Sequence, residues 1–292
     1  MFDQLRAFHR PTTVATALRL FDAERRTGGR GRFVAGGTDL VVQGDRSLRW
    51  LVDLTRLPLR YVKPRGAGWA IGATATMSDL ERSAALRRFA GGILAEAAGT
   101  AGSRQIRNMG TAGGNLANAS PACDLAPPLL ALDASVVIAG KGARRTVALD
   151  RFFKGVHRTA LDGGLLVEIV VPAPPKGARA AWSFQKLGRL QSDIALVNAA
   201  VAVVLDGNGR CTRARIALGA VAATPLRARR AEALLVGRAF DAAAVAAAAE
   251  RAAAETKPVS DVRASADYRR EMSRVLVARA LTECLERLGR TR

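Results

Sequence analysis

Two stretches of the sequence decide the expected fold: Val34-Ala-Gly-Gly-Thr-Asp-Leu40 and Gly110-Thr-Ala-Gly-Gly-Asn115. Each contains a Gly-Gly pair followed by a small polar residue. Glycine permits positive φ and close approach of the backbone to a ligand, and successive exposed N–H groups form a nest for an anion. Thr38 and Asn115 can add side-chain hydrogen bonds. Two such loops can clamp a pyrophosphate, which suits a dinucleotide; the alternative is a pair of ordinary tight turns.

Other nucleotide-binding and catalytic patterns are missing from the sequence. No G-x-G-x-x-G follows a predicted strand, which argues against a Rossmann site, and no G-x-x-x-x-G-K-[ST] occurs. The only histidines are His9 and His157; His157 has no acidic or cysteine partner at ligand spacing, and both are interpreted as structural or surface residues. Because no acid–base pair is apparent, no catalytic side chain is predicted and the chemistry is expected to come from a cofactor.

The cysteines predict neither a metal site nor a disulfide. Cys123, Cys211 and Cys284 are far apart, and no C-x-x-C occurs, so neither zinc nor an iron–sulfur cluster is expected in this chain. A sparse, odd count with no signal-peptide pattern predicts reduced thiols and a cytoplasmic protein. No apolar run reaches the length of a transmembrane helix.

The charge is strongly basic, at +20 for 292 residues of which 49% are hydrophobic. The arginines are spread along the whole chain and are not interleaved with aromatic residues that could stack on bases. Solvated faces or a surface that meets an acidic partner subunit explain this pattern. A basic nucleic-acid-binding protein is the alternative from a different functional class.

Local patterns predict a mixture of helices and strands without regular strand–helix alternation. Thr13 is a candidate N-cap for a helix that Gly28-Gly29 ends, and Ser78 with Glu81 forms a candidate capping box. Asp206-Gly-Asn-Gly209 predicts a hairpin. The expected helices are 13–27, 79–89, 91–102, 241–255 and 265–288. The expected strands are 33–35, 51–54, 69–74, 136–139, 165–171, 194–205 and 212–218, with a glycine-rich loop at 103–118 and a linker at 172–177.

At these motifs the sequence resembles the FAD-binding subunits of the xanthine dehydrogenase and carbon monoxide dehydrogenase family of molybdenum hydroxylases. The resemblance rests on A-G-G-T-D-L at 35–40, I-R-N-M-G-T-A-G-G-N at 106–115 and S-P-A-C-D at 120–124. It continues through L-L-V-E-I-V-V-P at 165–172, F-Q-K-L-G-R at 184–189, S-D-I-A at 192–195, A-A-T-P-L-R-A at 222–228 and D-Y-R-R-E-M at 267–272. It therefore covers nearly the whole chain.

The resemblance implies an α+β fold. A two-subdomain FAD-binding module of the vanillyl-alcohol-oxidase type would occupy residues 1–175, with subdomains of about 1–56 and 57–175. An α+β domain of the CO dehydrogenase flavoprotein type, with an antiparallel sheet, would follow at 178–290. Some relatives carry a cysteine-rich insertion for a further iron–sulfur cluster, and this chain lacks it.

The resemblance also implies roles for individual residues. Residues 34–40 and 111–115 would hold the pyrophosphate of FAD through backbone N–H groups, and Asp124 would accept hydrogen bonds from FAD hydroxyls. Leu166, Lys186 and Ile194 would lie near the isoalloxazine ring, where a cation favours the reduced flavin. The alternatives are plain core positions for Leu166 and Ile194 and a surface lysine for Lys186. The full predicted set is Val34, Ala35, Gly36, Gly37, Thr38, Asp39, Leu40, Thr111, Ala112, Gly113, Gly114, Asn115, Asp124, Leu166, Lys186 and Ile194.

The function implied by the resemblance is electron transfer within a larger enzyme. A large subunit would oxidise the substrate at a molybdopterin centre, and a small subunit with two [2Fe–2S] clusters would pass the electrons to FAD on this chain, in a heterotrimer or a dimer of heterotrimers. NAD, a quinone, another carrier or oxygen would be the terminal acceptor. A stand-alone flavin reductase that shares the FAD-binding module, like the enolpyruvyl reductase of cell-wall synthesis, is the alternative among flavoproteins.

Overall fold

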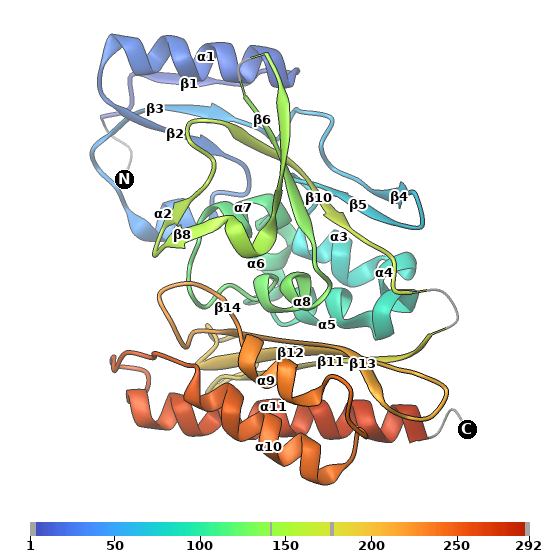
Figure 1. Ribbon diagram of the computed structural model, residues 1–292. Helices are drawn as coiled ribbons and strands as arrows, with labels where there is room; N and C mark the ends of the chain where they lie inside the picture. The colour runs from blue at the N-terminus through green and yellow to red at the C-terminus, as the bar shows by residue number, and fades with distance from the viewer. Residues whose placement is uncertain (1–3, 141, 176–177, 290–292) are drawn as a thin grey trace.

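The computed structural model describes residues 4–140, 142–175 and 178–289. It stacks three layers along one axis (Figure 1): a small N-terminal sheet with helix α1, a middle sheet with short helices beneath it, and a C-terminal sheet backed by helices. In these ranges, no helix is both long and apolar enough to cross a membrane.

The N-terminal layer is a parallel three-stranded sheet covered by α1 (Val14–Thr27). The side chain of Thr13 accepts a hydrogen bond from the Thr16 amide at 3.1 Å, and Gly28 ends the helix with φ 87°, so the predicted helix is confirmed. Its apolar face packs on the sheet, where Phe21 stacks on Phe33 with ring centroids 4.1 Å apart. The strands, in sheet order, are β1 (Ala7–His9), β3 (Leu48–Asp53) and β2 (Arg30–Val34); α2 (Thr38–Gln43) follows β2.

The middle layer is an antiparallel sheet that shares its core with a group of short helices. Its strands, in sheet order, are β4 (Val62–Arg65), β5 (Gly68–Gly72), β10 (Leu165–Val171), β6 (Ser135–Ala139) and β7 (Arg144–Ala148). The helices are α3 (Met77–Arg82), α4 (Ala84–Arg88), η1 (Phe89–Gly92), α5 (Ile93–Gly99), α6 (Arg104–Met109), α7 (Ala112–Ala117), α8 (Ala126–Ala131) and η2 (Leu149–Arg151). A short hairpin of β8 (Phe153–Gly155) and β9 (Arg158–Thr159) completes this layer.

The capping box lies two residues before the predicted one. The hydroxyl of Thr76 accepts from the Asp79 amide at 3.1 Å, and the Asp79 carboxylate accepts from the Thr76 amide at 2.9 Å. Ser83 then ends α3 and caps α4, so the continuous helix predicted to reach Phe89 is wrong. Ser78 is buried and donates to the Asn108 side chain instead of capping.

The C-terminal layer confirms the predicted antiparallel sheet. Its strands are β11 (Arg179–Leu187), β12 (Val197–Leu205), β13 (Cys211–Gly219) and β14 (Leu226–Arg227), in that order. The predicted hairpin forms, with Gly209 at φ 78° and the Asp206 amide donating to the Arg210 carbonyl at 2.9 Å. The helices on its outer face are α9 (Arg229–Leu235), α10 (Ala242–Ala254) and α11 (Ala266–Gly289). Residues 176–177 of the predicted linker lie outside the described ranges.

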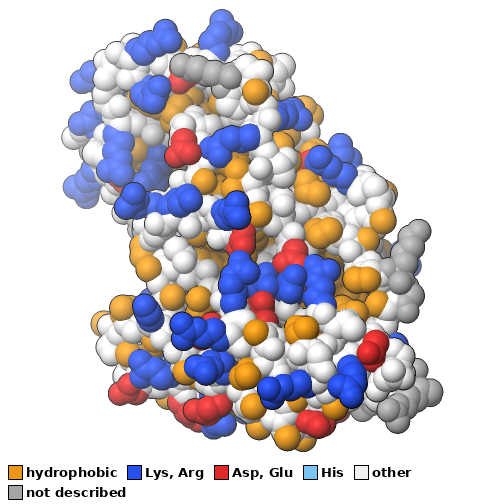
Figure 2. Space-filling model, viewed as in Figure 1, with side chains coloured by type: hydrophobic (Ala, Val, Ile, Leu, Met, Phe, Trp, Pro, Cys, Tyr) orange, Lys and Arg blue, Asp and Glu red, His pale blue; other side chains and the backbone are white. Residues whose placement is uncertain are grey.

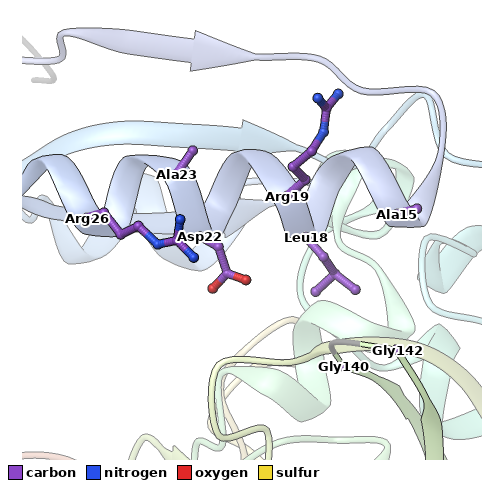
Figure 3. Close-up of a pocket in the computed structure, with 8 residues that line it drawn as sticks. All are labelled: Ala15, Leu18, Arg19, Asp22, Ala23, Arg26, Gly140 and Gly142. Atoms are coloured by element: carbon purple, nitrogen blue, oxygen red, sulfur yellow. The ribbon is translucent and has the colours of Figure 1, made fainter.

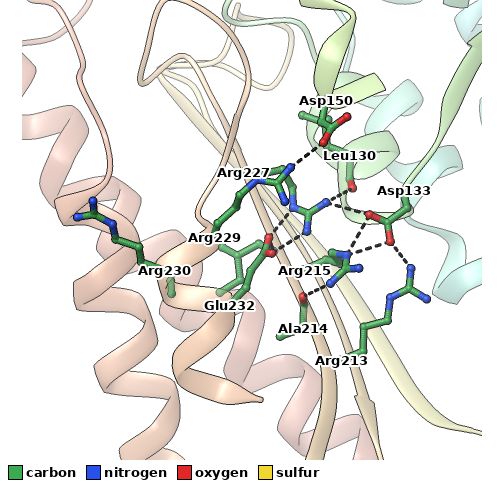
Figure 4. Close-up of polar contacts among 12 residues, drawn as sticks. Leu130, Asp133, Asp150, Arg213, Ala214, Arg215, Arg227, Arg229, Arg230 and Glu232 are labelled. Carbon is green, nitrogen blue, oxygen red and sulfur yellow. Dashed lines mark hydrogen bonds and ion pairs between the residues drawn. The ribbon is translucent and has the colours of Figure 1, made fainter. Parts of the chain in front are cut away.

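An ion-pair network joins the middle and C-terminal layers (Figure 4). Asp133, just after α8, accepts hydrogen bonds from Arg213, from Arg215 at 2.9 Å and from Arg227 at 2.9 Å. Burial by itself would raise the pKa of Asp133, but these arginines outweigh it and hold that pKa below its usual value. Arg227 also forms an ion pair with Glu232. Figure 2 shows basic side chains gathered on this face where the two layers meet, with acidic ones between them.

Asp133→Asn is expected to lower the free energy of unfolding at neutral pH by about 2 kcal/mol, as for other hydrogen bonds to charged groups. A carboxyl whose pKa is lower in the folded than in the unfolded state stabilises the fold at high pH and loses this effect as the pH falls. The difference in free energy of unfolding between variant and wild type should therefore narrow below about pH 4. Urea unfolding at several pH values measures it. Asp267→Asn is the control. Asp267 pairs with Arg270 at the surface and its side chain is 94% exposed, so this change should leave the free energy of unfolding the same within error. A gap that stays constant with pH would contradict the electrostatic explanation.

Candidate functional site

The two glycine loops lie against each other. A Cβ placed on Gly36 would sit 1.8 Å from the carbonyl oxygen of Met109, at the start of the second loop. A Cβ on Gly110 would lie 3.4 Å from Oγ1 of Thr38. The amide of Met77 donates to the Gly110 carbonyl at 2.9 Å and fixes the second loop on α3. The structure therefore brings together the two segments that the sequence singled out.

The first loop leaves its amide groups open. β2 ends at Val34, the chain turns through Gly37 at φ 69°, and α2 begins at Thr38. Within the described ranges, the N–H groups of Gly36, Gly37 and Thr38 donate no hydrogen bond. Unpaired amides at such a turn are donors for an anionic ligand.

The second loop has a different structure from the one expected. Residues 104–109 and 112–117 form the short helices α6 and α7, and Thr111 caps α7 by accepting from the Gly114 amide at 3.1 Å. The amides of Ala112 and Gly113 donate to the carbonyls of Ala75 (2.8 Å) and Ala73 (2.9 Å).

These contacts limit what residues 111–115 can donate, and their role in holding the pyrophosphate stays a prediction. Because the Asn115 amide also donates to the Thr111 carbonyl at 2.9 Å, the N–H groups of residues 112–115 are all paired within the protein. Gly113 is needed for packing, since a Cβ there would lie 2.6 Å from the Ala73 carbonyl oxygen. Among the described residues, this loop can still offer the N–H group of Thr111, which donates no hydrogen bond, and the side-chain amide of Asn115, whose Oδ1 accepts weakly from the Leu125 amide at 3.4 Å.

Asp124 and Lys186, which were predicted separately, form a buried ion pair. Nζ of Lys186 lies 2.9 Å from Oδ1 of Asp124 and donates to the Thr100 carbonyl at 2.7 Å. The two side chains are only 11% and 7% exposed, respectively. Burial raises the pKa of Asp124, and the Lys186 charge opposes this rise without cancelling it. The pair joins the segment before α8 to β11 of the C-terminal sheet.

Comparison with known proteins identifies the two parts of the chain. Residues 2–174 match the family described as "FAD binding domain in molybdopterin dehydrogenase", and residues 182–284 match the "CO dehydrogenase flavoprotein C-terminal domain". The chain belongs to this family of FAD-binding subunits. The predicted boundary at 175–178 falls between the matched ranges and stays a prediction.

Individual relatives resemble this FAD-binding subunit over nearly their whole lengths. The carbon monoxide dehydrogenase medium chain of Hydrogenophaga pseudoflava is 36% identical over 94% of this chain and 95% of its own. The 6-hydroxypseudooxynicotine dehydrogenase complex subunit alpha of Paenarthrobacter nicotinovorans is 36% identical over 91% and 90%. A chain of the solved carbon monoxide dehydrogenase of H. pseudoflava superposes with a TM-score of 0.91, at 36% identity, over 98% and 99% of the two chains. These matches set aside the nucleic-acid-binding and stand-alone reductase alternatives.

The residues of the subunit fit FAD. The open amides of Gly36, Gly37 and Thr38 suit a pyrophosphate. One buried polar atom, Oγ1 of Thr74, has no hydrogen-bond partner in the described part of the chain. Since buried polar atoms are normally paired, this hydroxyl suits a ligand that carries polar groups. The Asp124 carboxylate, with Lys186 at 2.9 Å from Oδ1, keeps lone pairs that can accept from the hydroxyls of such a ligand. Thr74 was not predicted from the sequence, where a threonine at the end of a strand has no distinguishing pattern.

The two apolar residues predicted near the flavin differ in exposure. Leu166 is buried in β10, beside an irregularity in its pairing with β6, and belongs to the main core. Ile194 is 60% exposed in the connection between β11 and β12, so the alternative of a plain core position is wrong for Ile194. Both remain predictions as flavin contacts.

Two cavities in the described part of the structure lie away from these residues. A space of about 420 Å³ opens between α1 and the turn after β6 (Figure 3), where Leu18 and Asp22 point toward Gly140 and Gly142. A second space of about 70 Å³ lies beside Arg213 and Arg215. None of the predicted site residues lines either space, so the loops and the buried pair define the candidate site better than cavity size does.

Proposed function

We propose that this chain is the FAD-carrying electron-transfer subunit of a molybdenum-containing hydroxylase or dehydrogenase. It would receive electrons from the [2Fe–2S] clusters of a small subunit and deliver them to a terminal acceptor. A large molybdopterin subunit would hold the substrate. The observation that carries the proposal is the full-length similarity to a carbon monoxide dehydrogenase medium chain, together with the glycine-loop pair and the buried Asp124–Lys186 pair.

The residues of the chain would divide the binding of FAD among them. The amides of residues 36–38 would donate to the pyrophosphate, with Asn115 adding its side-chain amide. Asp124 would accept from FAD hydroxyls, and Lys186 would place a positive charge near the flavin. Leu166 and Ile194 would contact the ring. FAD, when bound, supplies a group that takes up single electrons and releases pairs.

The cysteines support a division of cofactors between chains. Cys123, Cys211 and Cys284 are unpaired, and each is buried. In the described ranges, no cluster of three or more His, Cys, Asp or Glu side chains is placed to hold a metal ion. The proposal therefore assigns the metal centres to partner chains. Reduced thiols of this kind also support the inference that the protein is cytoplasmic.

The subunit is expected to carry FAD without a covalent bond. Cys123 adjoins Asp124, but burial raises the pKa of its thiol, which keeps it neutral and a poor nucleophile. Nε2 of His9 forms a hydrogen bond with Oε1 of Glu24 at 2.6 Å, and Nδ1 of His157 forms one with the Asn118 carbonyl oxygen at 2.7 Å. Acid precipitation should release all the yellow colour, and chromatography of the supernatant should show FAD. Colour retained in the pellet, or no flavin after reconstitution, would contradict the proposal.

The assembly is tested by isolating the chain from its native host. A tagged subunit should co-purify with two further chains, and metal analysis of that complex should find iron and molybdenum. The same subunit expressed alone should contain FAD without either metal. Recovery of only the single chain from cells that express the partners would count against the proposed assembly.

A further inference from the structure

Asn198 is a polar residue inside an apolar, fully buried strand. All of β12 is buried, and the side chain of Asn198 has no exposed surface. Neither its Oδ1 nor its Nδ2 has a hydrogen bond of good geometry with a described residue, although the amide lies close enough to the Asp124 carboxyl to lower its pKa. An unpaired buried polar group costs about 1–3 kcal/mol. An apolar residue would avoid that cost, so the unpaired amide points to a function in the loaded protein.

The sheet places this amide beside the Asp124–Lys186 pair. Asn198 lies directly opposite Lys186 of β11 on one side and Gly219 of β13 on the other. Opposed residues project from the same face of a sheet, so Asn198 faces the same way as Lys186. A Cβ on Gly219 would lie 2.1 Å from Oδ1 of Asn198 and 3.2 Å from Pro127. Glycine at 219 therefore leaves room for the amide next to the segment that carries Asp124.

The electrostatics of Asp124 explain what the amide can do there. Burial raises the pKa of Asp124, while Lys186 and the Asn198 amide both lower it. Two other titratable groups belong to this environment, the thiol of Cys123 and the carboxyl of Asp39. Burial keeps the thiol neutral, and the negative charges of Asp124 and Asp39 raise its pKa further. A neutral donor such as Asn198 favours the ionised carboxylate without adding a charge that would compete with Lys186.

We propose that Asn198 is a positioning residue of the FAD site: its side-chain amide donates to Asp124 in the loaded subunit and holds this carboxylate in the ionised form that accepts from FAD. The proposal rests on the proposed function, because Asp124 can act on FAD only if the chain binds FAD. No ligand contact of Asn198 itself is required.

The test is the FAD dissociation constant of the apoprotein between about pH 5.5 and 8.5, followed by quenching of flavin fluorescence. Asn198→Leu keeps the volume and removes the donor, so FAD binding should be lost at a pH about one unit higher than in the wild type. We call the pH range over which binding is lost on acidification the acid limb. At a fixed pH on this limb, Asn198→Leu should bind FAD about tenfold more weakly than the wild type, and at alkaline pH the two affinities should be equal. The isosteric Asn198→Asp places a second carboxylate beside Asp124. It should move the acid limb to a still higher pH than Asn198→Leu does.

Two further variants separate positioning from packing. In an Asp124→Asn background, Asn198→Leu should have no additional effect on FAD affinity, because the residue acts through Asp124. Asn198→Ser, which keeps a donor, should shift the limb less than Asn198→Leu. An unshifted limb in Asn198→Leu, or a weakening equal at every pH, would overturn the proposal. A wild-type chain that binds no FAD would instead refute the proposed function.

Discussion

Gly36→Ala is expected to weaken FAD binding at least about a hundredfold, equivalent to about 2.7 kcal/mol. The added Cβ would sit 1.8 Å from the Met109 carbonyl oxygen and 2.5 Å from the carbonyl carbon. Both atoms belong to backbone and cannot rotate away, so the two loops must separate. Separation displaces the open amides of residues 36–38 relative to the second loop and should also lower the stability of the apoprotein by about 1–3 kcal/mol, as in other overpacked sites.

Gly37→Ala and Gly207→Ala complete a graded series. At Gly37 a Cβ has room, with Val34 the nearest side chain at 3.7 Å, but φ of 69° strains alanine by about 1–2 kcal/mol. The loss of affinity should therefore be smaller than for Gly36→Ala. Gly207, in the β12–β13 hairpin, has nothing within 4 Å of a Cβ and serves as the control. Titration with FAD and urea unfolding of each apoprotein measure the series. A folded Gly36→Ala variant that binds FAD like the wild type would show that close packing of the loops is unimportant.

Elements determined by adjacent residues were predictable from the sequence. Thr13 and Gly28 bound α1, and Asp206-Gly-Asn-Gly209 forms the hairpin, because capping and turn geometry depend on a few neighbouring side chains. The sequence could not choose between the capping pairs Thr76–Asp79 and Ser78–Glu81. That choice depends on the burial of Ser78 against Asn108, a contact between distant segments.

The second glycine loop shows why local reasoning fails at the site. Gly113 and Gly114 predict a loop, because glycine in a helix costs about 1 kcal/mol relative to alanine. Hydrogen bonds to the carbonyls of Ala73 and Ala75, some forty residues earlier in the sequence, stabilise α7 despite this cost. From the sequence, Gly36 and Gly37 also look equivalent. Only the structure shows that one is needed for close packing and the other for a left-handed conformation.

Lys186→Met is expected to destabilise the apoprotein by about 3 kcal/mol at neutral pH, as when one partner of a buried ion pair is removed. Asp124 is then buried without a counter-charge, so its folded pKa rises further above the unfolded value of about 3.9. Because the folded state holds its proton to higher pH, the free energy of unfolding falls as pH rises between those two pKa values, by about 1.4 kcal/mol per unit. The loss should therefore be small near pH 4 and grow above it, as urea unfolding would show.

The double variant Lys186→Met/Asp124→Asn should recover most of that stability, because it removes both charges and leaves only the Thr100 carbonyl without its donor. Arg274→Met, at a surface pair with Glu271, is the control for loss of an exposed cation and should change little. A double variant as unstable as the single one would show that Lys186 contributes by packing and not by charge.

The same pair changes what Lys186 can do to the flavin. A cation without a partner would stabilise the reduced flavin with its full charge. Lys186 forms a neutral pair with an ionised Asp124, so its effect on the flavin is smaller. In Lys186→Met, protonation of Asp124 at low pH leaves the site neutral again, whereas ionisation at high pH leaves it negative. The midpoint potential of the single variant should therefore fall below that of the wild type by about 30 mV or more only at alkaline pH. The double variant should stay near the wild type wherever Asp124 is ionised in the wild type. An equal fall at all pH values would mean that Lys186 acts on the flavin as an isolated cation, independently of Asp124.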